Sequence, residues 1–380
     1  MDFKLTDEQQ MIRRTAREFA QEKVAPQAAQ RDETREFPLD LVRRLGELGF
    51  MGVTVDPRWD GAGMDAVSYA LAVEEISRGC ASTGVIMSAH NSLVCDPVEK
   101  FGTDAQKEMF LKPLAAGSKL GAHGLTEPQA GSDAGSIKLR AVADGDEWVL
   151  NGTKVFITNG GYADLLLIFA TTDPEQKSRG ISAFIVEKER EGFKVGTREK
   201  TMGIRASSTS EIILENVRVP KENLLGDVNK GFKIAMITLN GGRIGIAAQA
   251  VGIAQAALDG AITYAKERQQ FGRPIGSFQA IQWMLADMAT ELEAARLLTL
   301  RAAHIRDRGE DYATAAAQAK LFASRVAMRV SDRAIQIHGG YGYTADYSAE
   351  RLLRDAKITE LYEGTSEIQR LVIARSLLSD

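Results

Sequence analysis

The stretch EWVLNGTKVFIT, residues 147–158, has a β pattern in a chain whose two ends have helical patterns. Apolar and polar residues alternate on both sides of Asn151-Gly152, and both of these residues tolerate positive φ, so the pair predicts a hairpin turn. Similar runs occupy residues 164–172, 180–188 and 211–220. We therefore predict a middle antiparallel β domain, barrel-like in form, over residues 119–228.

The chain before this domain has a helical pattern, with periodic apolar positions from Thr6 to about Gly117. Thr6 and Gln9 predict a capping box for the first helix. Prolines at positions 26, 38, 57 and 97 interrupt the pattern. Residues 1–118 are thus expected to form an N-terminal all-α domain.

Long helices return after Gly231, and the first, Phe232 to Arg268, would span about 55 Å. Its apolar positions, like those of the two helices that follow, are expected on one face. That face comprises Ile244, Ala248, Val251, Gln255, Leu258, Ile262 and Ala265. With a last helix after Ser366, residues 229–380 are predicted to form a C-terminal four-helix bundle, which makes the fold class α+β.

Composition narrows the class of protein. The 380 residues are 44% hydrophobic and 26% charged, with a net charge of -4, so no field of one sign favours nucleic acid or an anionic membrane as main partner. No run of about 18 apolar residues is present, which predicts a soluble, unexported protein without a membrane span. Cys80 and Cys95 lack metal-ligand spacing, so buried thiols and no metal site are expected.

Two glycine-rich stretches allow two interpretations each. GAGMDA, from Gly61, matches a dinucleotide fingerprint but lacks a surrounding βαβ unit and a following acid, so we interpret it as a turn. GLTEPQAGSDAGS, residues 124–136, offers backbone N–H groups and short hydroxyls suited to a cofactor, or is an ordinary polar loop.

Three further features fall within or after the long helices. Gly241-Gly242 weakens a helix by roughly 1 kcal/mol per glycine, which indicates either close approach of another group or a tolerated kink. Arg268 suits a pyrophosphate or simply the helix carboxyl end. His338 is either a catalytic residue or a packed or capping histidine. The second interpretation is favoured, because no acidic residue stands at a spacing that would make it a catalytic partner.

ELYEGTSEIQR, residues 360–370, contains three glutamates with different explanations. Ser366 and Gln369 predict a capping box for the last helix, which explains Glu367 in its first turn. Glu363 stands in the loop before Gly364, beside apolar and aromatic groups. A carboxylate held there is expected to have a raised pKa and to act as a base.

Seven motifs in order make the chain resemble the acyl-CoA dehydrogenase family over essentially its whole length, most closely the short-chain (butyryl-CoA) type. They are LTEPQAGSD, LNGTKVFITN, MGIRAS, GRIGIAAQAVG, RQQFGRPI, QIHGGYGY and LYEGTSEIQR. Each is weak alone, whereas together they are specific. The resemblance implies an acyl-CoA dehydrogenase-like fold in which FAD lies without a Rossmann fold between the strand domain and the bundle.

The resemblance also implies which residues contact FAD. The flavin is expected to lie between two segments of the strand domain, His123, Leu125, Thr126, Gly131 and Ser132 on one side and Phe156, Ile157 and Thr158 on the other. Thr365, Ser366 and Glu367 contact the FAD of their own subunit. Arg268, Phe271, Gln279, Gln336, Ile337, His338, Gly339 and Gly340 reach the FAD of a neighbouring subunit. Such sharing implies a homotetramer built as a dimer of dimers.

By the same resemblance, Glu363 is the catalytic base of a fatty acid β-oxidation enzyme. It removes the pro-R α-proton of a saturated short-chain acyl-CoA while the β-hydrogen leaves as hydride to flavin N5, giving a trans-2-enoyl-CoA. The backbone N–H of Glu363 and a ribityl hydroxyl polarise the thioester carbonyl. Substrate contacts are implied for Ser132, Asn240, Gly241, Gly242, Arg243 and Gly364. The electron acceptor is expected to be electron-transferring flavoprotein.

Gly242 sharpens this assignment, because family members acting on isovaleryl-CoA take their base from that helix position. Two alternatives remain open. An acyl-CoA oxidase uses the same site with oxygen, although such chains are usually much longer. A non-catalytic relative binds flavin and nucleic acid through an added basic carboxyl-terminal region, whereas this chain ends RLVIARSLLSD soon after the site. A bacterial-type cytoplasmic chain is expected, with a mature mitochondrial matrix form as the alternative.

Overall fold

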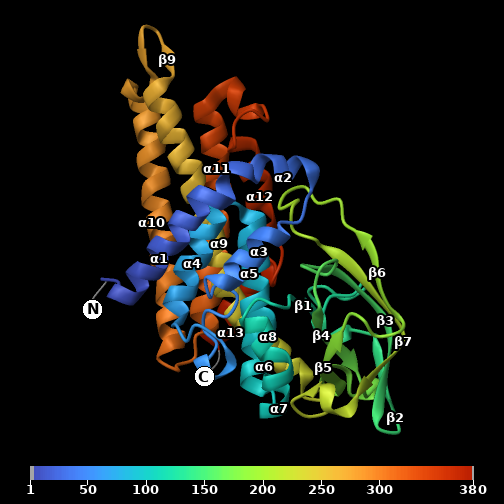
Figure 1. Ribbon diagram of the computed structural model, residues 1–380. Helices are drawn as coiled ribbons and strands as arrows, with labels where there is room; N and C mark the ends of the chain where they lie inside the picture. The colour runs from blue at the N-terminus through green and yellow to red at the C-terminus, as the bar shows by residue number, and fades with distance from the viewer. Residues whose placement is uncertain (1–3, 379–380) are drawn as a thin grey trace.

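A computed structural model describes residues 4–378 and shows a layer of helices from both ends of the chain beside one large sheet (Figure 1). The first part of the chain is helical, as predicted. Its α-helices are α1 (Asp7–Phe19), α2 (Ala28–Thr34), α3 (Leu39–Glu47), α4 (Ala66–Gly79), α5 (Ala81–His90), α6 (Asp96–Phe101), α7 (Asp104–Gln106) and α8 (Lys112–Ala115). The capping box at α1 is confirmed, because the Thr6 hydroxyl accepts from Gln9 N–H and the Gln9 side chain accepts from Thr6 N–H.

The middle of the chain forms an eight-stranded sheet in the order β6-β7-β3-β2-β4-β5-β8, with β1 paired to β4. The strands are β1 (Gly121–Gly124), β2 (Arg140–Asp144), β3 (Glu147–Ile157), β4 (Leu165–Thr171), β5 (Ile181–Glu187), β6 (Phe193–Arg198), β7 (Ser210–Pro220) and β8 (Leu224–Leu225). Most pairs are antiparallel, as expected, but β1 and β2 each pair with β4 in parallel. The sheet is therefore mixed around β4, where it adjoins the helices.

The hairpin predicted at Asn151-Gly152 is wrong. Both residues lie inside β3, at a bulge in its pairing with β7, and the chain turns instead at Gly145, where φ is 58°. Gly152 has φ 143°, and a Cβ there would lie 2.8 Å from the Leu139 side chain. The glycine thus permits close packing within the sheet and not a reversal of the chain.

The last part of the chain is again helical, with a short β hairpin at the tip of its first two long helices (Figure 1). Its elements are α9 (Gly231–Glu267), β9 (Gln269–Gln270), β10 (Arg273–Pro274), α10 (Gln279–Asp307), α11 (Ala313–His338), α12 (Ala349–Ile358) and α13 (Ser366–Leu378). Helices α9, α10 and α11 pack on one another, and α13 packs on α11.

Helix α9 is more deeply buried than its sequence pattern indicates. Every residue from Gly241 to Ala254 is buried, because α4 and α5 pack on α9 as well as α10 and α11. The expectation of a single apolar face is therefore wrong for this segment. By length and composition α9 alone among the helices of residues 4–378 qualifies for crossing a membrane, yet 78% of its most apolar window is buried inside the protein, as in a core helix.

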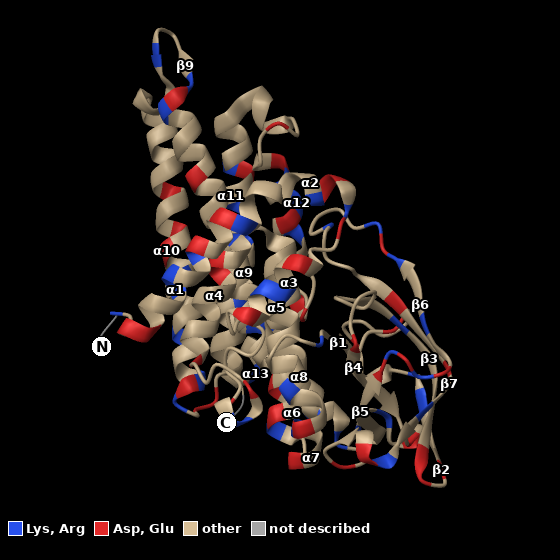
Figure 2. Cartoon of the chain, in the orientation of Figure 1, with Lys and Arg blue, Asp and Glu red and all other residues tan. Residues whose placement is uncertain are grey.

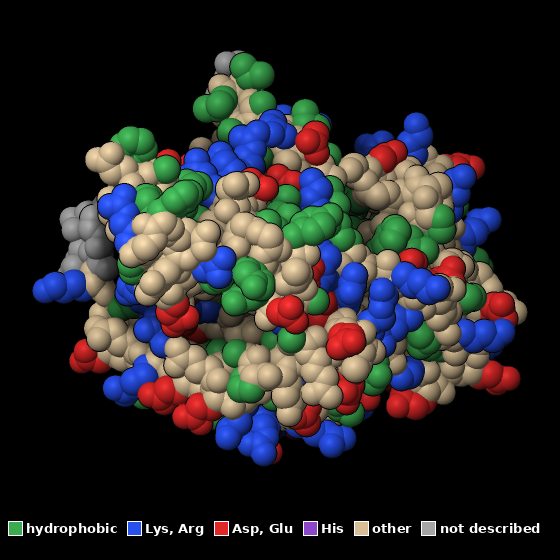
Figure 3. Space-filling model, turned by 90° about the horizontal axis from the view of Figure 1, so that it is seen from above, with side chains coloured by type: hydrophobic (Ala, Val, Ile, Leu, Met, Phe, Trp, Pro, Cys, Tyr) green, Lys and Arg blue, Asp and Glu red, His purple; other side chains and the backbone are tan. Residues whose placement is uncertain are grey.

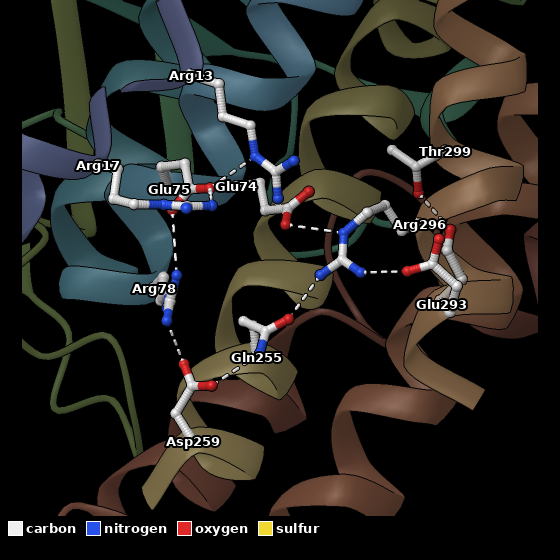
Figure 4. A network of polar contacts seen from close by, with 11 residues as sticks. Arg13, Arg17, Glu74, Glu75, Arg78, Gln255, Asp259, Glu293, Arg296 and Thr299 are labelled. Atoms are coloured by element: carbon white, nitrogen blue, oxygen red, sulfur yellow. Dashed lines mark hydrogen bonds and ion pairs between the residues drawn. The ribbon is translucent and has the colours of Figure 1, made fainter. Parts of the chain in front are cut away.

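Ion pairs around two buried acids, Glu74 and Glu75, join the first and last helical parts (Figure 4). Glu75 of α4 accepts from Arg17 of α1, and Glu74 accepts from Arg296 of α10 at 3.0 Å. Arg78 extends the network to Asp259 of α9. Because breaking a buried pair leaves an uncompensated charge, these contacts fix α1, α4, α9 and α10 relative to one another.

Surface charges of both signs are interspersed over the helices and the sheet (Figure 2), and both signs occur among hydrophobic side chains on the face seen from above (Figure 3). Cys80 and Cys95 are free and buried. Within residues 4–378, no cluster of three His, Cys, Asp or Glu side chains is placed to hold a metal ion.

Candidate active site

Glu363 lies on the loop between α12 and α13, in a backbone conformation that few side chains adopt. Its φ is 51°, and that of Gly364 is 91°. Such left-handed geometry is uncommon for a residue with a side chain and persists only where surrounding contacts hold it. The loop is therefore shaped to aim the Glu363 side chain in one direction.

Three contacts hold this loop from behind. The Gln369 amide donates to the carbonyl oxygens of Glu363 and Gly364, at 3.2 and 2.8 Å. Lys320 of α11 donates to the same Gly364 oxygen at 2.8 Å. The predicted capping box at Ser366 is wrong by one position, because Ser366 is already helical and the Thr365 hydroxyl accepts from the Ile368 N–H. The Gln369 side chain therefore binds the loop carbonyls and takes no part in a capping box.

The Glu363 carboxylate points at α9, where Gly242 leaves room for it. A Cβ at Gly242 would overlap the carboxylate and lie 2.9 Å from Leu93. Gly241 faces another way, toward Arg306 and Tyr312. Of the two glycines, Gly242 is the one whose missing side chain admits the acid.

Burial raises the pKa of Glu363 to about 7, while the positive charges of Lys320 and Arg243 oppose the rise. Its Oε2 atom is buried and has no hydrogen-bond partner within residues 4–378, and the same holds for Arg243 Nε. Arg243 donates from Nη1 to Asn240 Oδ1 at 2.7 Å. Buried polar atoms rarely stay unpaired, so these two are expected to meet a polar ligand.

The predicted flavin segments lie side by side. Val155 N–H donates to the Thr126 carbonyl at 2.9 Å, and Lys154 donates to the Leu125 carbonyl and to Glu127 Oε1 at 2.9 and 2.7 Å. The His123 Nε2 atom is buried without a partner in the described chain. These hydrogen bonds join the segment 123–127 to residues 154–155. We call this polar cluster the cradle, and its His123 Nε2 atom is unpaired within residues 4–378.

Other members of these segments are exposed or half-buried beside that cradle. Gly131 and Ser132 are exposed, Thr158 is half-buried and Ile157 is buried. Phe156 is 63% exposed despite being aromatic, and its φ is 58°. An exposed aromatic ring on strained backbone is expected to pack on a ligand.

The third predicted group lies far from Glu363 in the same chain. Arg268 follows the end of α9, about 39 Å along the helix from Gly242. It lines a pocket of about 450 Å³ with Ile337, His338, Gly339 and Gly340. Gln336 and Gln279 are exposed, and Phe271, at the tip of the β9–β10 hairpin, is 93% exposed. His338 packs on Tyr264, with ring centroids 4.4 Å apart, and its Nδ1 lies 2.7 Å from the Ala334 carbonyl.

Two contributors to the site were missed from sequence. Lys320 and Gln369 are fully buried and bind the Glu363–Gly364 loop. The signal for Lys320 was a single charge inside the alanine-rich run AAAQAKLFAS, residues 315–324. GAGMDA, in contrast, was predicted to be a turn, but residues 61–65 form an irregular segment that leads into α4, with Gly61 packed on Val55.

Comparisons with known proteins agree with this architecture. The sequence models of the N-terminal, middle and C-terminal domains of acyl-CoA dehydrogenases match residues 6–118, 122–217 and 229–378. A short-chain specific acyl-CoA dehydrogenase of Clostridium acetobutylicum is 54% identical, over 98% of this chain and 99% of the relative.

Solved structures give the same result. Butyryl-CoA dehydrogenase from Megasphaera elsdenii superposes with a TM-score of 0.99 at 48% identity, over the full length of both chains. A chain from a structure of the electron transferring flavoprotein of Acidaminococcus fermentans superposes with a TM-score of 0.99 at 53% identity, also over both full lengths. This chain therefore belongs to the acyl-CoA dehydrogenase family.

Proposed function

We propose that the protein oxidises a short-chain saturated acyl-CoA to its trans-2-enoyl-CoA, with Glu363 as the base, and passes the electrons to electron-transferring flavoprotein. The observation that carries the proposal is the Glu363 carboxylate seated against Gly242, with an unpaired buried oxygen and a pKa of about 7. A base with that pKa is about half ionised at neutral pH. Similarity to short-chain and butyryl-CoA enzymes supports the substrate class.

The residues act on the substrate as follows. Glu363 accepts the α-proton, while its backbone N–H, which has no acceptor within residues 4–378, is free to donate to the thioester carbonyl. Asn240, Gly241, Gly242, Arg243, Gly364 and Ser132 are proposed to contact the substrate. The strained turn at Glu363 and Gly364 prearranges base and N–H together, so little reorganisation is needed during reaction.

Members of this family bind FAD, and the residues present fit that cofactor. The ring nitrogen of His123 is unpaired among the described residues and Phe156 is exposed, as expected of groups that contact a cofactor. We propose that they hold FAD together with Leu125, Thr126, Ser132, Thr365, Ser366 and Glu367. When bound, FAD supplies the acceptor for the β-hydride. Because the Arg268 group lies so far from Glu363 along α9, we propose that it serves the FAD of a neighbouring subunit in a homotetramer.

The proposal is tested with purified holoprotein under anaerobic conditions. Butyryl-CoA is expected to bleach the flavin absorbance and, with electron-transferring flavoprotein present, to turn over. Glu363→Gln is expected to retain flavin but lose turnover by about 100- to 10,000-fold. Wild-type turnover in Glu363→Gln would falsify the assignment of the base. An acyl-CoA series from four to twelve carbons, compared by kcat/KM, tests the short-chain assignment.

A further inference from the structure

We propose that Lys320 of α11 is a positioning residue for the base: its ammonium fixes the Glu363–Gly364 turn and places a positive charge behind the carboxylate. The inference rests on the proposed role of Glu363. Lys320 donates to the loop carbonyl of Gly364 and not to the Glu363 carboxylate, so it acts through the loop and through its charge.

The burial of Lys320 is unusual for a lysine. Its side chain has no exposed surface, and its ammonium donates to a backbone carbonyl, that of Gly364, at 2.8 Å. Within residues 4–378 no carboxylate lies within ion-pair distance of it. Lys154, which is equally buried, has Glu127 Oε1 at 2.7 Å. A buried ammonium without a direct counter-ion costs stability, which indicates a role other than holding the fold together.

The contact made by Lys320 falls on the part of the loop that sets the direction of the base. Glu363 and Gly364 adopt successive left-handed conformations, and the Gly364 carbonyl receives both Lys320 and Gln369. Two donors, from α11 and α13, therefore fix this one peptide group. This peptide group comes directly after Gly364, which follows Glu363, so holding it restricts the turn from which the Glu363 carboxylate and backbone N–H project.

The charges around Glu363 make Lys320 important for ionisation as well. Arg243 from α9 and Lys320 from α11 are the cations that act on the carboxylate. Tyr362 in the loop and Tyr69 of α4 are the other titratable groups that interact with it, and both have their pKa raised, by burial first. Of the two cations, the effect of Lys320 is the larger. Without Lys320, the positive charge of Arg243 alone would oppose the rise that burial causes in the pKa of Glu363.

The pKa of Lys320 stays high enough for the side chain to be mostly protonated at neutral pH. Burial lowers its pKa to about 8, and the negative charge of Glu363 is the largest effect opposing that fall, followed by Glu360 and Glu367, with Arg243 acting the other way. Lys320 and Glu363 thus favour each other's charged forms through space.

Four variants separate charge from hydrogen bonding. Lys320→Met removes both the charge and the donor at similar volume, and Lys320→Gln removes the charge but keeps a donor. Gln369→Met removes the other donor to the Gly364 carbonyl without changing charge. Arg325→Met removes an exposed cation from the same helix and serves as the matched control.

The main measurement is kcat against pH with butyryl-CoA, on holoprotein. In both Lys320 variants the acidic limb is expected to move up by about one pH unit, which lowers kcat at pH 7 about fivefold, because the ionised fraction of the base falls from about one half to about one eleventh, while KM changes little. Gln369→Met is expected to lower kcat without moving the limb. Arg325→Met is expected to match the wild type.

A second measurement does not depend on turnover. The difference in thermal midpoint between a protein and its Glu363→Gln derivative reports the ionisation of Glu363. In the Lys320→Met background this difference is expected to develop at higher pH than in the wild type.

The outcomes test the role of Lys320 separately from the proposed role of Glu363 as the base. If Lys320→Met retains flavin and has the wild-type acidic limb, while Glu363→Gln is inactive, the role of Lys320 is wrong and the base stands. If Glu363→Gln turns over normally, the proposed function itself fails. If Lys320→Gln restores the wild-type limb, the donor alone matters and the charge does not.

Discussion

The carboxylate of Glu363 occupies the space that a side chain at Gly242 would fill. The loop that carries Glu363 can therefore approach α9 closely only because residue 242 has no side chain. This contact joins the carboxyl-terminal loop to the deeply buried helix α9.

Gly242→Ala is therefore expected to displace the base. The new methyl group would overlap the Glu363 carboxylate and crowd Leu93. Because a displacement of about 1 Å can reduce turnover about a hundredfold, kcat with butyryl-CoA is expected to fall by that order while flavin is retained.

Gly260→Ala is the matched control on the same helix, since a Cβ at Gly260 meets nothing within 4 Å. It is expected to leave kcat unchanged and to stabilise the protein by up to about 1 kcal/mol, because alanine is the better helix former. Equal kinetics for the two variants would show that Gly242 has no special role.

Sequence patterns were sufficient where one local rule dominates. The capping box at Thr6 and the helix–strand–helix order both follow from short-range chemistry. Sequence patterns failed where tertiary packing determines the backbone conformation. Gly152 was interpreted as a turn because its conformational freedom is local, whereas its reason is a neighbour, Leu139, that only the folded sheet brings close.

The site divides in the same way. Glu363 was predicted from an acid placed before a glycine in a loop, and its raised pKa was expected from apolar neighbours. Lys320 was not predicted, because a single lysine in an alanine-rich run does not reveal its partner, which is a backbone carbonyl from another segment. Motif resemblance located segments, whereas the structure shows which of their atoms are unpaired.

The stability of the holoprotein is expected to depend on Glu363 ionisation. Its pKa is raised from 4.5 to about 7, so the stability that it contributes is fully present below pH 4.5 and is lost as pH rises through 7. Glu363→Gln cannot ionise. Its thermal midpoint is expected to exceed that of the wild type by a few degrees at pH 8 and by less at pH 5.

Asp56→Asn is the control for this titration, because Asp56 lies outside the site and its pKa is lowered, first by a hydrogen bond from the Arg58 side chain. The stability that Asp56 contributes is present above pH 3.8 and is lost at lower pH, so Asp56→Asn is expected to be slightly less stable than the wild type above pH 3.8. A thermal difference for Glu363→Gln that is the same at both pH values would contradict the raised pKa.

The buried pair Lys154–Glu127 is expected to support the flavin cradle. Lys154 has no exposed surface, and Glu127 also accepts from the Lys138 and Leu139 N–H groups. Lys154→Met would leave a buried carboxylate unpaired and is expected to cost about 3–5 kcal/mol in the free energy of unfolding. Because Lys154 also holds the Leu125 carbonyl, the retained flavin is expected to decrease.

A double-mutant cycle checks this pair. Adding Glu127→Gln to Lys154→Met removes the unpaired charge and is expected to recover part of the lost stability. The exposed pair Lys194–Glu215 is the comparison, and Lys194→Met is expected to cost less than about 1 kcal/mol. Additive losses in the Lys154–Glu127 cycle would show that the two residues are not coupled.

Sharing of flavin between subunits is expected to appear as complementation. Arg268→Ala should weaken flavin binding, because a guanidinium pairs with phosphate oxygens through two donors. Arg273→Ala, on the same exposed hairpin but packed on Phe278, serves as its control and should bind flavin normally. If Arg268 serves the neighbour, a mixed dimer of Arg268→Ala and Glu363→Gln subunits has one site that carries both defects and one site that carries neither.

Random mixing of these two inactive proteins by unfolding and reassembly should thus restore about one quarter of wild-type turnover, since half of the dimers are mixed and each has one intact site. If Arg268 instead serves its own subunit, every site keeps one defect and no activity returns. Turnover measured before and after mixing, at a limiting FAD concentration at which the Arg268→Ala protein alone is inactive, decides between the two arrangements. Mixing Gly242→Ala with Glu363→Gln is the negative control, because both changes affect the same subunit's base and no mixed dimer gains an intact site.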